Sequence, residues 1–532
     1  MKISVAIPAF ASTNYKGGLF LKDLINSVLQ QTYVNYEIVV SDHSDGNEIF
    51  EVVLDFIEKT DIVYFRNKEK KGNISANTNN AILKCSGDII KVLHVDDKIC
   101  NNNLFQQIID GFKSNPKAKW GACAFNHIYD NENNECRYMI PDTNGIIGNP
   151  SVSFFVNDKS DMILYDENLK YILDEDFHKR LLNKYNSPII ISDTSITIRM
   201  HDSQASKTLN KFHQEDIDKI NKRKNGIFTN KTEEQKHIVI GGAGFIGSHI
   251  VDHLVDSGNN VLIIDNLLTG KIKNINPQSC FLKLNVSDEN NIKVLEKHIN
   301  KGDVIYNLAA IARVQPSIQN PIGYNKNNTN GVLNVLYAAY LSKAKRVIFS
   351  SSSSVYGDTQ TLPTHEDVLT NPLSPYGLQK LIGEQYNALF SKVYGLDTVS
   401  LRYFNVYGER MVDEGAYCTV IGTFSKQLKN GEKLTITNNG EQKRDFTYVK
   451  DVVRANILAA KNEDRFNGDV FNIGSGINYT INQIADFIGG EKEYVGNVTE
   501  PYETLSDNKK AKEVLKWNPK GNVEMWIKNN VK

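Results

Sequence analysis

Short apolar runs alternate with amphipathic stretches along the first part of the chain. Residues 3–7 form an apolar run that stops at a proline, and apolar residues between 21 and 29 then recur three and four positions apart. The run at 36–42 ends in an aspartate, and the run at 88–97 ends in two aspartates. Because strands are short apolar runs and helices have a repeat of about 3.6 residues, this pattern predicts alternating strands and helices.

The same alternation starts again at residue 237. Apolar runs lie at 237–240, 261–264, 304–308 and 346–350, with stretches of helical spacing between them. Strands that alternate with helices favour a parallel, doubly wound sheet whose ligands gather at the carboxyl ends of the strands. We therefore expect an α/β chain made of two such units.

The stretch between the two units is polar. Asn, Lys, Glu and Gln dominate from 207 to 235. This composition predicts domains at 1–206 and 236–532, joined by a linker at 207–235. The alternative is a charged amphipathic helix packed on either domain, because Phe212, Ile217 and Ile220 recur near helical spacing.

Charge and cysteine content exclude several classes of function. The 532 residues carry a formal net charge of −1, so no broad field attracts nucleic acid or an anionic membrane. The six cysteines contain no Cys-x-x-Cys pair, which argues against a zinc ribbon and a disulfide framework. The apolar run at the N-terminus is too short for a signal sequence or a membrane span. We expect a cytoplasmic protein, with a peripheral position at the inner face of the membrane as the second location considered.

A glycine-rich turn follows the first apolar run of the second unit. Gly241, Gly244 and Gly247 stand three positions apart, a spacing that lets the backbone approach a pyrophosphate at a helix N-terminus. Asp265 ends the next apolar run, where a carboxylate accepts both hydroxyls of an adenosine ribose and repels a 2'-phosphate. The two features together predict NAD, rather than NADP, as the cofactor.

A tyrosine and a lysine stand four positions apart after a serine-rich run. Residues 350–354 are all serine at the end of a predicted strand, and Ser374 and Pro375 are typical of a helix start. Tyr376 and Lys380 then fall on one face of that helix. The ammonium of Lys380 and a cationic nicotinamide are expected to lower the pKa of Tyr376. Tyr376 would then take a proton from a sugar hydroxyl.

With these motifs in this order, residues 237–532 resemble the extended short-chain dehydrogenases, and among them the nucleotide-sugar 4-epimerases. The resemblance extends to Asn307–Ala310, Tyr324–Gly331, Leu401–Gly408 and Arg444–Val449. It implies a Rossmann fold, in which a doubly wound parallel sheet carries a small substrate-binding subdomain. It also implies a homodimer held through this domain.

The resemblance further implies roles for individual residues. Ser352 would share the substrate hydroxyl with Tyr376, and Lys380 would also hold the nicotinamide ribose. Asn405 and Arg444 would meet the substrate diphosphate, where a guanidinium suits paired phosphate oxygens. The implied NAD-binding residues are Gly241, Gly244, Phe245, Ile246, Gly247, Asp265, Asn266, Val286, Leu308, Ala309, Ala310, Asn328, Tyr376, Lys380 and Tyr403.

Departures from the family pattern refine the reaction and the sugar. Relatives that remove water across C5 and C6 carry an acidic pair where this chain has Ser353 and Ser354, so the resemblance favours epimerisation. Thr504 stands where 4-epimerases limited to plain hexoses have a tyrosine, which implies that UDP-GlcNAc is converted to UDP-GalNAc; the alternative is that Thr504 only packs. Asn497 replaces a phosphate-binding arginine, and Thr437 replaces an aromatic beside the nucleobase, which leaves the base less certain than the reaction.

Residues 1–206 resemble family 2 glycosyltransferases of the GT-A fold. Ser27–Tyr33 followed by Asn35–Asp42 is the most specific stretch, and Asn73–Gly87 fits the helix before the metal motif. A carboxylate base suits such a transfer, and hard oxygen ligands suit Mg or Mn bridging a diphosphate. The implied residues are Asp42 at the nucleobase, Asp96, Asp97 and His201 at the metal, Arg199 near the diphosphate, and Asp176 as the base that deprotonates the acceptor.

One departure concerns this metal motif. The first acid of the usual Asp-x-Asp pattern is His94 in this chain. The metal would therefore depend on Asp96 and Asp97, or be held weakly.

Together the resemblances predict a bifunctional enzyme. The C-terminal part would epimerise C4 of a UDP-hexose or UDP-N-acetylhexosamine with NAD. The N-terminal part would transfer a sugar from a nucleotide donor to a glycan or lipid-linked glycan, as in polysaccharide assembly. Two alternatives stay open: an N-terminal part that only binds glycan or docks the epimerase, and a C-terminal part that is a reductase consuming NADH.

Overall fold

A computed structural model describes residues 1–12, 15–129, 138–139, 141, 149–200, 210–222, 235–411, 419–496 and 501–531. The chain forms two compact units, one of residues 1–232 with 280–283 and one of residues 233–279 with 284–532. None of the described helices is both long and apolar enough to cross a membrane.

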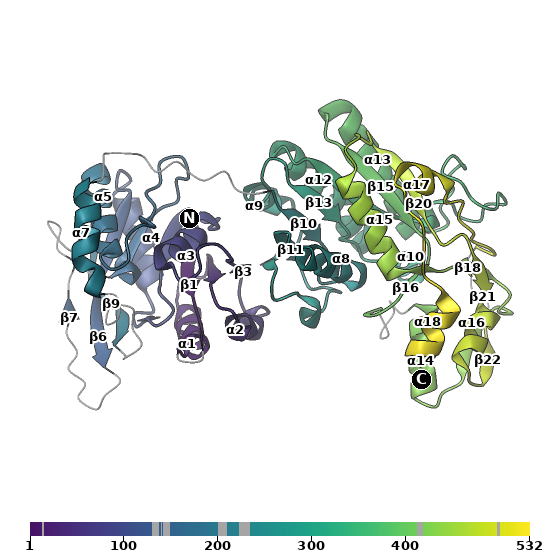
Figure 1. The fold of residues 1–532 in the computed structure, drawn as a ribbon, viewed down its shortest axis with the longest axis horizontal. Helices are drawn as coiled ribbons and strands as arrows, with labels where there is room; N and C mark the ends of the chain where they lie inside the picture. The colour runs from purple at the N-terminus through teal and green to yellow at the C-terminus, as the bar shows by residue number, and fades with distance from the viewer. Residues whose placement is uncertain are drawn as a thin grey trace. The chain divides into compact units, whose positions relative to one another are not determined.

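The first unit is built on a mixed sheet (Figure 1). Its strand order is β3, β2, β1, β4, β8, β6, β9, β5, and the first four strands run parallel. The described strands are β1 (Ile3–Ala9), β2 (Tyr36–Asp42), β3 (Ile62–Arg66), β4 (Ile89–Val92), β5 (Lys98–Ile99), β6 (Trp120–Tyr129), β7 (Tyr138–Met139), β8 (Ser153–Val156) and β9 (Ile189–Met200). The described helices are α1 (Gly17–Leu29), α2 (Glu48–Phe56), α3 (Ile74–Leu83), α4 (Leu104–Ser114), α5 (Leu173–Tyr185) and α7 (His213–Lys222).

The apolar runs at the N-terminus become the centre of this sheet. β1 is buried along its whole length between β2 and β4, because neighbouring strands and helices cover both of its faces. The carboxyl ends of these parallel strands meet at one edge. The aspartates that end the runs at 36–42 and 88–97 therefore lie at the same edge of the sheet.

A helix occupies part of the stretch that composition predicts as a linker. Asp216 of α7 is fully buried and accepts the backbone N–H groups of Lys170, Tyr171 and Ile172 at 2.8, 2.6 and 3.3 Å. The helix is therefore part of the first unit over 213–222, as the alternative interpretation has it. Composition favoured a linker here because only one face of α7 packs on the unit, so most of its residues are polar.

The second unit is a doubly wound sheet (Figure 1). Its six central strands are all parallel, in the order β20, β15, β14, β13, β10, β11. The order reverses between β10 and β13, which opens a crevice at their carboxyl ends. The central strands are β10 (His237–Ile240), β11 (Val261–Asp265), β13 (Val304–Asn307), β14 (Arg346–Ser352), β15 (Thr398–Tyr403) and β20 (Asp469–Ile473).

Helices cover both faces of this sheet. α8 (Phe245–Asp256) packs on α15 (Val449–Lys461), while α12 (Gly331–Leu341) packs on α9 (Ile292–His298) and α13 (Pro375–Tyr394), and the strands lie between these two groups (Figure 1). This three-layer arrangement explains why the strands read as continuous apolar runs. The shorter elements nearby are α10 (Val314–Gln319), α11 (Pro321–Asn325), α17 (Lys509–Val514) and β12 (Cys280–Lys283), the last grouped with the first unit.

A smaller second core stands beside the doubly wound sheet. It is formed by buried apolar side chains such as Phe424, Leu434, Ile484 and Ile527. Its elements are β16 (Val406–Tyr407), α14 (Val420–Lys429), β17 (Leu434–Thr437), β18 (Lys443–Asp445), β19 (Thr447–Tyr448), β21 (Asn478–Thr480), α16 (Ile481–Ile488), β22 (Lys492–Val495) and α18 (Val523–Asn530). The predicted α/β architecture with a small subdomain is confirmed.

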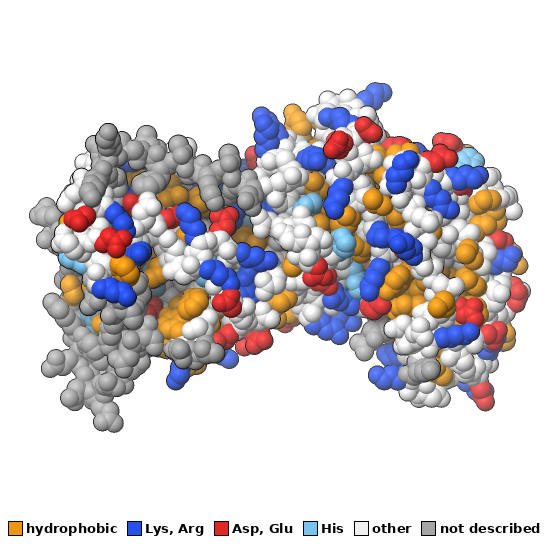
Figure 2. Space-filling model, viewed as in Figure 1, with side chains coloured by type: hydrophobic (Ala, Val, Ile, Leu, Met, Phe, Trp, Pro, Cys, Tyr) orange, Lys and Arg blue, Asp and Glu red, His pale blue; other side chains and the backbone are white. Residues whose placement is uncertain are grey.

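The surface agrees with the near-zero net charge. On the face of the second unit shown in Figure 2, Lys and Arg side chains are interspersed with Asp, Glu and apolar side chains. Mixed charges of this kind produce no broad field. Recognition of a charged ligand therefore depends on local groups inside the crevice.

Candidate active site

The glycine turn of the second unit leaves room for a ligand backbone. Gly241 has a φ of +80°, which an L side chain rarely adopts, and a Cβ atom on Gly247 would lie 2.2 Å from the Gly241 carbonyl oxygen. Gly244 precedes α8, and no described side chain caps this helix. The first N–H groups of α8 therefore stay available to an anion.

Asp265 ends β11 beside this turn. Its Oδ2 accepts the Ala243 N–H at 3.0 Å, and its Oδ1 accepts the Leu267 N–H at 2.8 Å. Burial raises the pKa of this carboxyl, and the two backbone donors oppose that effect. Each oxygen keeps a further lone pair, so the carboxylate can still accept hydroxyls from a ribose.

The crevice holds one elongated cavity that joins the glycine turn to Tyr376 and Lys380. Every predicted NAD-binding residue except Asn328 lies on its wall. The wall also includes Ser350, Ser351, Asn327, Arg313 and Ser287. The residues present thus fit a dinucleotide: glycines for its pyrophosphate, a carboxylate for one ribose, and polar groups at the far end.

Asn328 is the predicted NAD-binding residue that does not line the cavity. Its side chain is buried behind the cavity wall, where its amide group accepts the Ile311 N–H at 2.7 Å and donates to the Ile311 carbonyl at 3.0 Å. It also donates to Gln379 of α13 at 2.9 Å. Asn328 therefore holds the loop at 309–312 in place, and all of its polar atoms are used in doing so.

The chemical end of the cavity is built by α13 and β14. The Ser374 side chain caps α13 by accepting the Gly377 N–H at 3.1 Å, which fixes the first turn that carries Tyr376. Burial raises the pKa of Tyr376, and a hydrogen bond with Ser352 and the charge of Arg313 both lower it. The Ser354 hydroxyl donates to Ser352 at 2.9 Å, a contact that the sequence pattern did not indicate.

Lys380 lies on the expected helix face but acts on a different partner. Its Nζ donates to the Ser350 carbonyl at 2.6 Å and lies 5.9 Å from the centre of the Tyr376 ring. Burial lowers the pKa of Lys380 to about 8, and the charge of Glu384 opposes this shift. With the groups of the chain alone, burial raises the pKa of Tyr376 while Ser352 and Arg313 lower it; the effect of Lys380 together with a bound nicotinamide stays a prediction.

The predicted substrate residues gather around β18 and do not line the cofactor cavity. Asn405 donates to the Asp445 carbonyl at 3.1 Å, and the Thr504 hydroxyl accepts the Asp445 N–H at 3.3 Å. Arg444 is buried, and its Nη1 donates to the Lys443 carbonyl at 2.8 Å. The structure therefore brings Asn405, Arg444 and Thr504 together. Asn497 lies outside the described residues.

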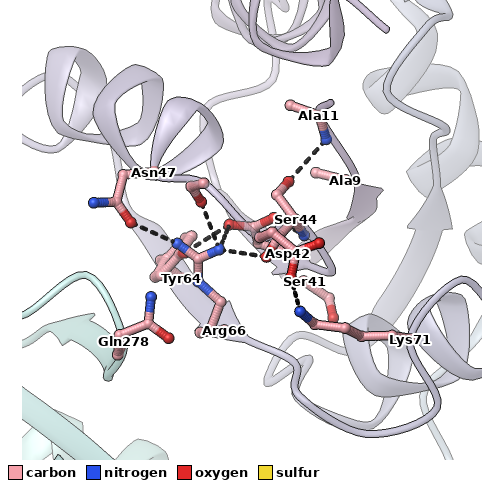
Figure 3. Close-up of polar contacts among 12 residues, drawn as sticks. Ala9, Ala11, Ser41, Asp42, Ser44, Asn47, Tyr64, Arg66, Lys71 and Gln278 are labelled. Atoms are coloured by element: carbon pink, nitrogen blue, oxygen red, sulfur yellow. Dashed lines mark hydrogen bonds and ion pairs between the residues drawn. The ribbon is translucent and has the colours of Figure 1, made fainter. Parts of the chain in front are cut away.

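In the first unit, Asp42 is held by its own neighbours (Figure 3). Its fully buried carboxylate accepts the Ser44 N–H at 2.8 Å and the Tyr64 hydroxyl at 2.7 Å, and it pairs with Arg66 at 3.2 Å. Arg66 also donates to Asn47 at 3.1 Å. These bonds tie down the loop after β2 and fix the Asp42 carboxylate in place; its contact with a nucleobase stays a prediction.

The acidic pair after β4 forms a second cluster. Asp97 is buried, and burial together with the neighbouring Asp96 raises its pKa. Among the described residues, Oδ2 of Asp97 has no hydrogen-bond partner. His94 is enclosed beside this pair, and burial lowers its pKa. Two carboxylates of which one has an unsatisfied oxygen fit a cation that takes its other ligands from phosphate.

Two further predicted residues of this unit are Arg199, expected near the diphosphate, and His201, expected at the metal. Arg199 pairs with Asp23 at 3.0 Å and lies over the Phe20 ring. His201 lies outside the described residues. Within the ranges that the structure describes, no group of three or more His, Cys, Asp and Glu side chains is arranged to hold a metal.

Two acids at the start of α5 differ in their environments. Asp176, the predicted base, is buried and accepts the Arg180 Nε–H at 2.8 Å. Asp174 lies two residues earlier on the same helix, and burial raises its pKa to about 7. A base is most effective when its pKa lies near the working pH, so Asp174 is a second candidate beside Asp176. Sequence spacing alone does not separate them.

Comparison with known proteins identifies both units. Residues 237–474 match the family model described as NAD dependent epimerase/dehydratase family, and residues 4–163 match Glycosyl transferase family 2. A UDP-glucose 4-epimerase from Lactobacillus helveticus is 34% identical over 310 residues, which cover 54% of this chain and 92% of the relative.

Two solved structures extend the comparison. A UDP-glucose 4-epimerase from Thermotoga maritima, solved with UDP-glucose, is 37% identical with a TM-score of 0.52, over 56% of this chain and 97% of that one. A UDP-N-acetylglucosamine 4-epimerase from Methanobrevibacter ruminantium, in complex with UDP-N-acetylmuramic acid, has the same identity and TM-score over 56% and 98%. The chain belongs to the NAD dependent epimerase/dehydratase family, and its residues 4–163 are similar to Glycosyl transferase family 2.

Proposed function

We propose that the second unit catalyses NAD-dependent epimerisation at C4 of a UDP-sugar. The observation that carries this proposal is the cavity that joins the glycine turn and Asp265 to Tyr376 and Lys380. A site of this kind holds a dinucleotide at one end and a proton-transfer group at the other. The similar UDP-sugar 4-epimerases support the same reaction.

The residues of the chain supply the proton transfer. NAD, when bound, would accept a hydrogen with its electron pair from C4 and return it to the opposite face of the sugar. Tyr376 in its ionised form would take the proton of the C4 hydroxyl and give it back when the hydrogen returns. Ser352, itself held by Ser354 at 2.9 Å, would orient that hydroxyl. Lys380 would keep the ribose end of the cavity polar.

Epimerisation is favoured over loss of water. Elimination across C5 and C6 needs an acid near the 4-keto sugar, and Ser353 and Ser354 offer only hydroxyls that do not ionise at neutral pH. Without an acid for elimination, the 4-keto sugar is expected to take its hydrogen back at C4, which completes epimerisation.

The sugar is proposed to be an N-acetylhexosamine. Thr504 is a small residue whose hydroxyl is bonded to the Asp445 N–H, so its methyl group and not a ring would face the C2 substituent. Asn405, which precedes β16, and Arg444 of β18 would meet the diphosphate. The similar UDP-N-acetylglucosamine 4-epimerase supports this choice, whereas the similar UDP-glucose 4-epimerases support the plain hexose.

A panel of UDP-sugars tests both statements. The full chain is incubated with UDP-Glc or UDP-GlcNAc, and the C4 isomers are separated. The proposal expects conversion of UDP-GlcNAc to UDP-GalNAc, with a Tyr376→Phe variant slower by about a hundredfold or more. Turnover of UDP-Glc alone would overturn the sugar assignment. Net oxidation of NADH would favour the reductase alternative.

We further propose that the first unit transfers a sugar from a nucleotide donor to a glycan or lipid-linked glycan. Support comes from the match to the family 2 glycosyltransferases and from the unsatisfied carboxylate oxygen of Asp97. Asp96 and Asp97 would hold a Mg or Mn ion, which would stabilise the departing diphosphate. Linked in one chain, the second unit would make the nucleotide sugar that the first unit uses.

Release of UDP distinguishes this proposal from a docking role. The full chain is supplied with UDP-sugars, with and without Mn²⁺, and free UDP is measured. Metal-stimulated release supports transfer, and glycan binding without any release supports the docking alternative. Asp174→Asn and Asp176→Asn variants then locate the base: loss of transfer in the first and not in the second assigns it to Asp174.

A homodimer through α12 and α13 is proposed as well. These two packed helices expose large apolar side chains on the second unit, and the rings of Tyr340 and Tyr394 pair at 5.0 Å. The exposed residues are Tyr337, Tyr340, Leu341, Leu378, Leu389, Val393 and Tyr394. A second copy would cover them with the same surface. A Tyr340→Glu variant that stays dimeric in sedimentation analysis would contradict this.

A further inference from the structure

One buried carboxylate joins three segments of the second unit. Asp445 of β18 has no exposed surface, and both of its carboxylate oxygens accept hydrogen bonds. Oδ1 accepts the N–H and the hydroxyl of Ser475 at 2.8 and 2.6 Å. Oδ2 accepts the Gly476 N–H at 3.0 Å, and the N–H and the hydroxyl of Ser506 at 3.1 and 2.6 Å. A carboxylate has about four lone-pair sites, so these donors use it fully.

The backbone groups of Asp445 hold two of the predicted substrate residues. Its N–H donates to the Thr504 hydroxyl at 3.3 Å, and its carbonyl accepts the Asn405 amide at 3.1 Å. Asn405 closely follows Tyr403, which ends β15 and lines the cofactor cavity. The third predicted substrate residue, Arg444, directly precedes Asp445. All polar groups of Asp445 thus bind segments that carry or adjoin the predicted substrate residues.

Two glycines leave room for this carboxylate. A Cβ atom on Gly474 would lie 2.9 Å from Oδ2 of Asp445 and would overlap the Ser506 hydroxyl. Gly476 has a φ of +76°, which L side chains rarely adopt, and in this conformation its N–H reaches the carboxylate. The loop after β20 is therefore shaped to surround Asp445.

We propose that Asp445 is a positioning residue of the sugar site: its carboxylate holds Thr504 in a fixed position relative to Arg444, and selectivity for the substituent at C2 depends on this. The inference rests on the epimerase function proposed above and adds a residue that acts through others. Ser506 lies two residues after Thr504, so its bonds to Oδ2 hold the segment that carries Thr504. Ser475 holds the other oxygen from a loop without a predicted substrate residue.

An asparagine cannot replace this carboxylate without conflict. Both oxygens of Asp445 accept backbone N–H groups, so either orientation of an amide would turn its NH₂ group toward a donor. Asp445→Asn would therefore disturb both attached segments and could prevent folding. Variants that remove a single arm of the arrangement give the cleaner test.

Ser506→Ala and Ser475→Ala form a matched pair of variants. Each removes one hydroxyl that lies 2.6 Å from the carboxylate, and each keeps the backbone N–H. For Ser506→Ala, the ratio of kcat/KM for UDP-GlcNAc to that for UDP-Glc should fall about tenfold, the size of one hydrogen bond to a charged group. The loss should lie in KM, with kcat within about twofold, because the variant does not touch the proton-transfer residues. Ser475→Ala should change the ratio by less than about twofold.

A double variant tests whether Ser506 acts through Thr504. In a Thr504→Ala background, Ser506→Ala should change the ratio by less than about twofold, because the side chain that it positions is already shortened. A full tenfold effect in that background would overturn the proposal.

Two readouts separate positioning from a general loss of structure. The NAD affinity of both single variants, measured by equilibrium dialysis, should match that of the unaltered chain, because neither serine lines the cofactor cavity. Their melting temperatures should fall alike, since each loses one hydroxyl bond to the same carboxylate. Loss of NAD affinity in Ser506→Ala, or an equal change of the sugar ratio in both variants, would reduce Asp445 to a structural role and overturn the proposal.

A binding measurement without turnover separates this inference from the proposed reaction. UDP-GlcNAc and UDP-Glc are titrated calorimetrically into the NAD-loaded full chain, with EDTA present to remove the metal that the first unit is proposed to need. Weaker UDP-GlcNAc binding by Ser506→Ala, with UDP-Glc binding nearly unchanged, supports the role of Asp445 even where no C4 isomer forms, and then only the reaction has failed. Equal UDP-GlcNAc binding by Ser506→Ala and the unaltered chain would overturn the role of Asp445, while C4 epimerisation by the unaltered chain would leave the reaction standing.

Discussion

A Cβ atom on Gly247 would lie 2.2 Å from the carbonyl oxygen of Gly241, so only glycine permits this closure of the turn. A Gly247→Ala variant must open the turn or displace α8, and overpacking of this kind costs about 1–3 kcal/mol. We expect NAD affinity to fall about tenfold or more, as measured by equilibrium dialysis. Gly331→Ala, where the nearest atom is 3.6 Å away, is the matched control. Equal NAD binding by both variants would contradict this account of the turn.

The buried amine of Lys380 predicts a pH-dependent stability. Its pKa is about 8 in the fold against 10.5 for the ordinary group. A base whose pKa falls on folding costs stability below its folded pKa, and this cost fades as the pH rises from about 8 towards 10.5. The stability gained by Lys380→Met over the unaltered chain should therefore shrink by about 3 kcal/mol across this window.

Urea unfolding of both proteins at several pH values measures this difference. Changes elsewhere in the chain cancel in the comparison because only one side chain differs. A stability difference that stays constant from neutral to alkaline pH would show that Lys380 is not charged and buried in the way described.

The ion pair of Glu384 and Arg402 should be costly to break. Both side chains are buried, they meet at 2.7 Å, and Glu384 also accepts the Ser351 hydroxyl at 2.5 Å. Glu384→Ala leaves a buried guanidinium uncompensated, which destabilises by about 3–5 kcal/mol. The double variant Glu384→Met, Arg402→Met should recover most of this loss. The transition of the second unit, followed by loss of epimerase activity in urea, measures both.

Asp216 should matter to the first unit alone. Asp216→Asn weakens three bonds to the backbone before α5, and hydrogen bonds to charged groups contribute about 1.5–3 kcal/mol each. We expect earlier unfolding of the first unit in differential scanning calorimetry, with epimerase rates unchanged. Asp218→Asn, at an exposed position of the same helix, serves as the control. Equal melting of both variants would mean that α7 does not support α5.

The wall of the cofactor cavity could be predicted from the sequence because its signals are local. Glycine spacing sets the turn after β10, and a strand that ends in Asp265 places a carboxylate at the sheet edge whatever the rest of the chain does. Asn328 shares a family motif with the wall residues, yet it does not line the cavity. Its place behind the wall depends on Ile311 and Gln379, which come together only in the fold.

The electrostatics of the site could not be predicted in the same way. The Tyr376 and Lys380 spacing was correct, yet the ammonium turns to the Ser350 carbonyl because α13 packs on β14. The positive φ of Arg313 could not be predicted, because this backbone conformation is usually indicated by a glycine and the residue here is an arginine. Asp42 is a similar case, since its neutralising partner Arg66 comes from the next strand of the sheet.

The most direct test follows the hydrogen at C4 of the sugar. UDP-GlcNAc is incubated with the full chain in D₂O, and the product is examined by NMR. The account predicts that UDP-GalNAc forms with ordinary hydrogen at C4 and without net NADH, because the hydrogen that leaves C4 is the one that returns. Deuterium at C4 of the product, or no C4 isomer at all, would contradict it.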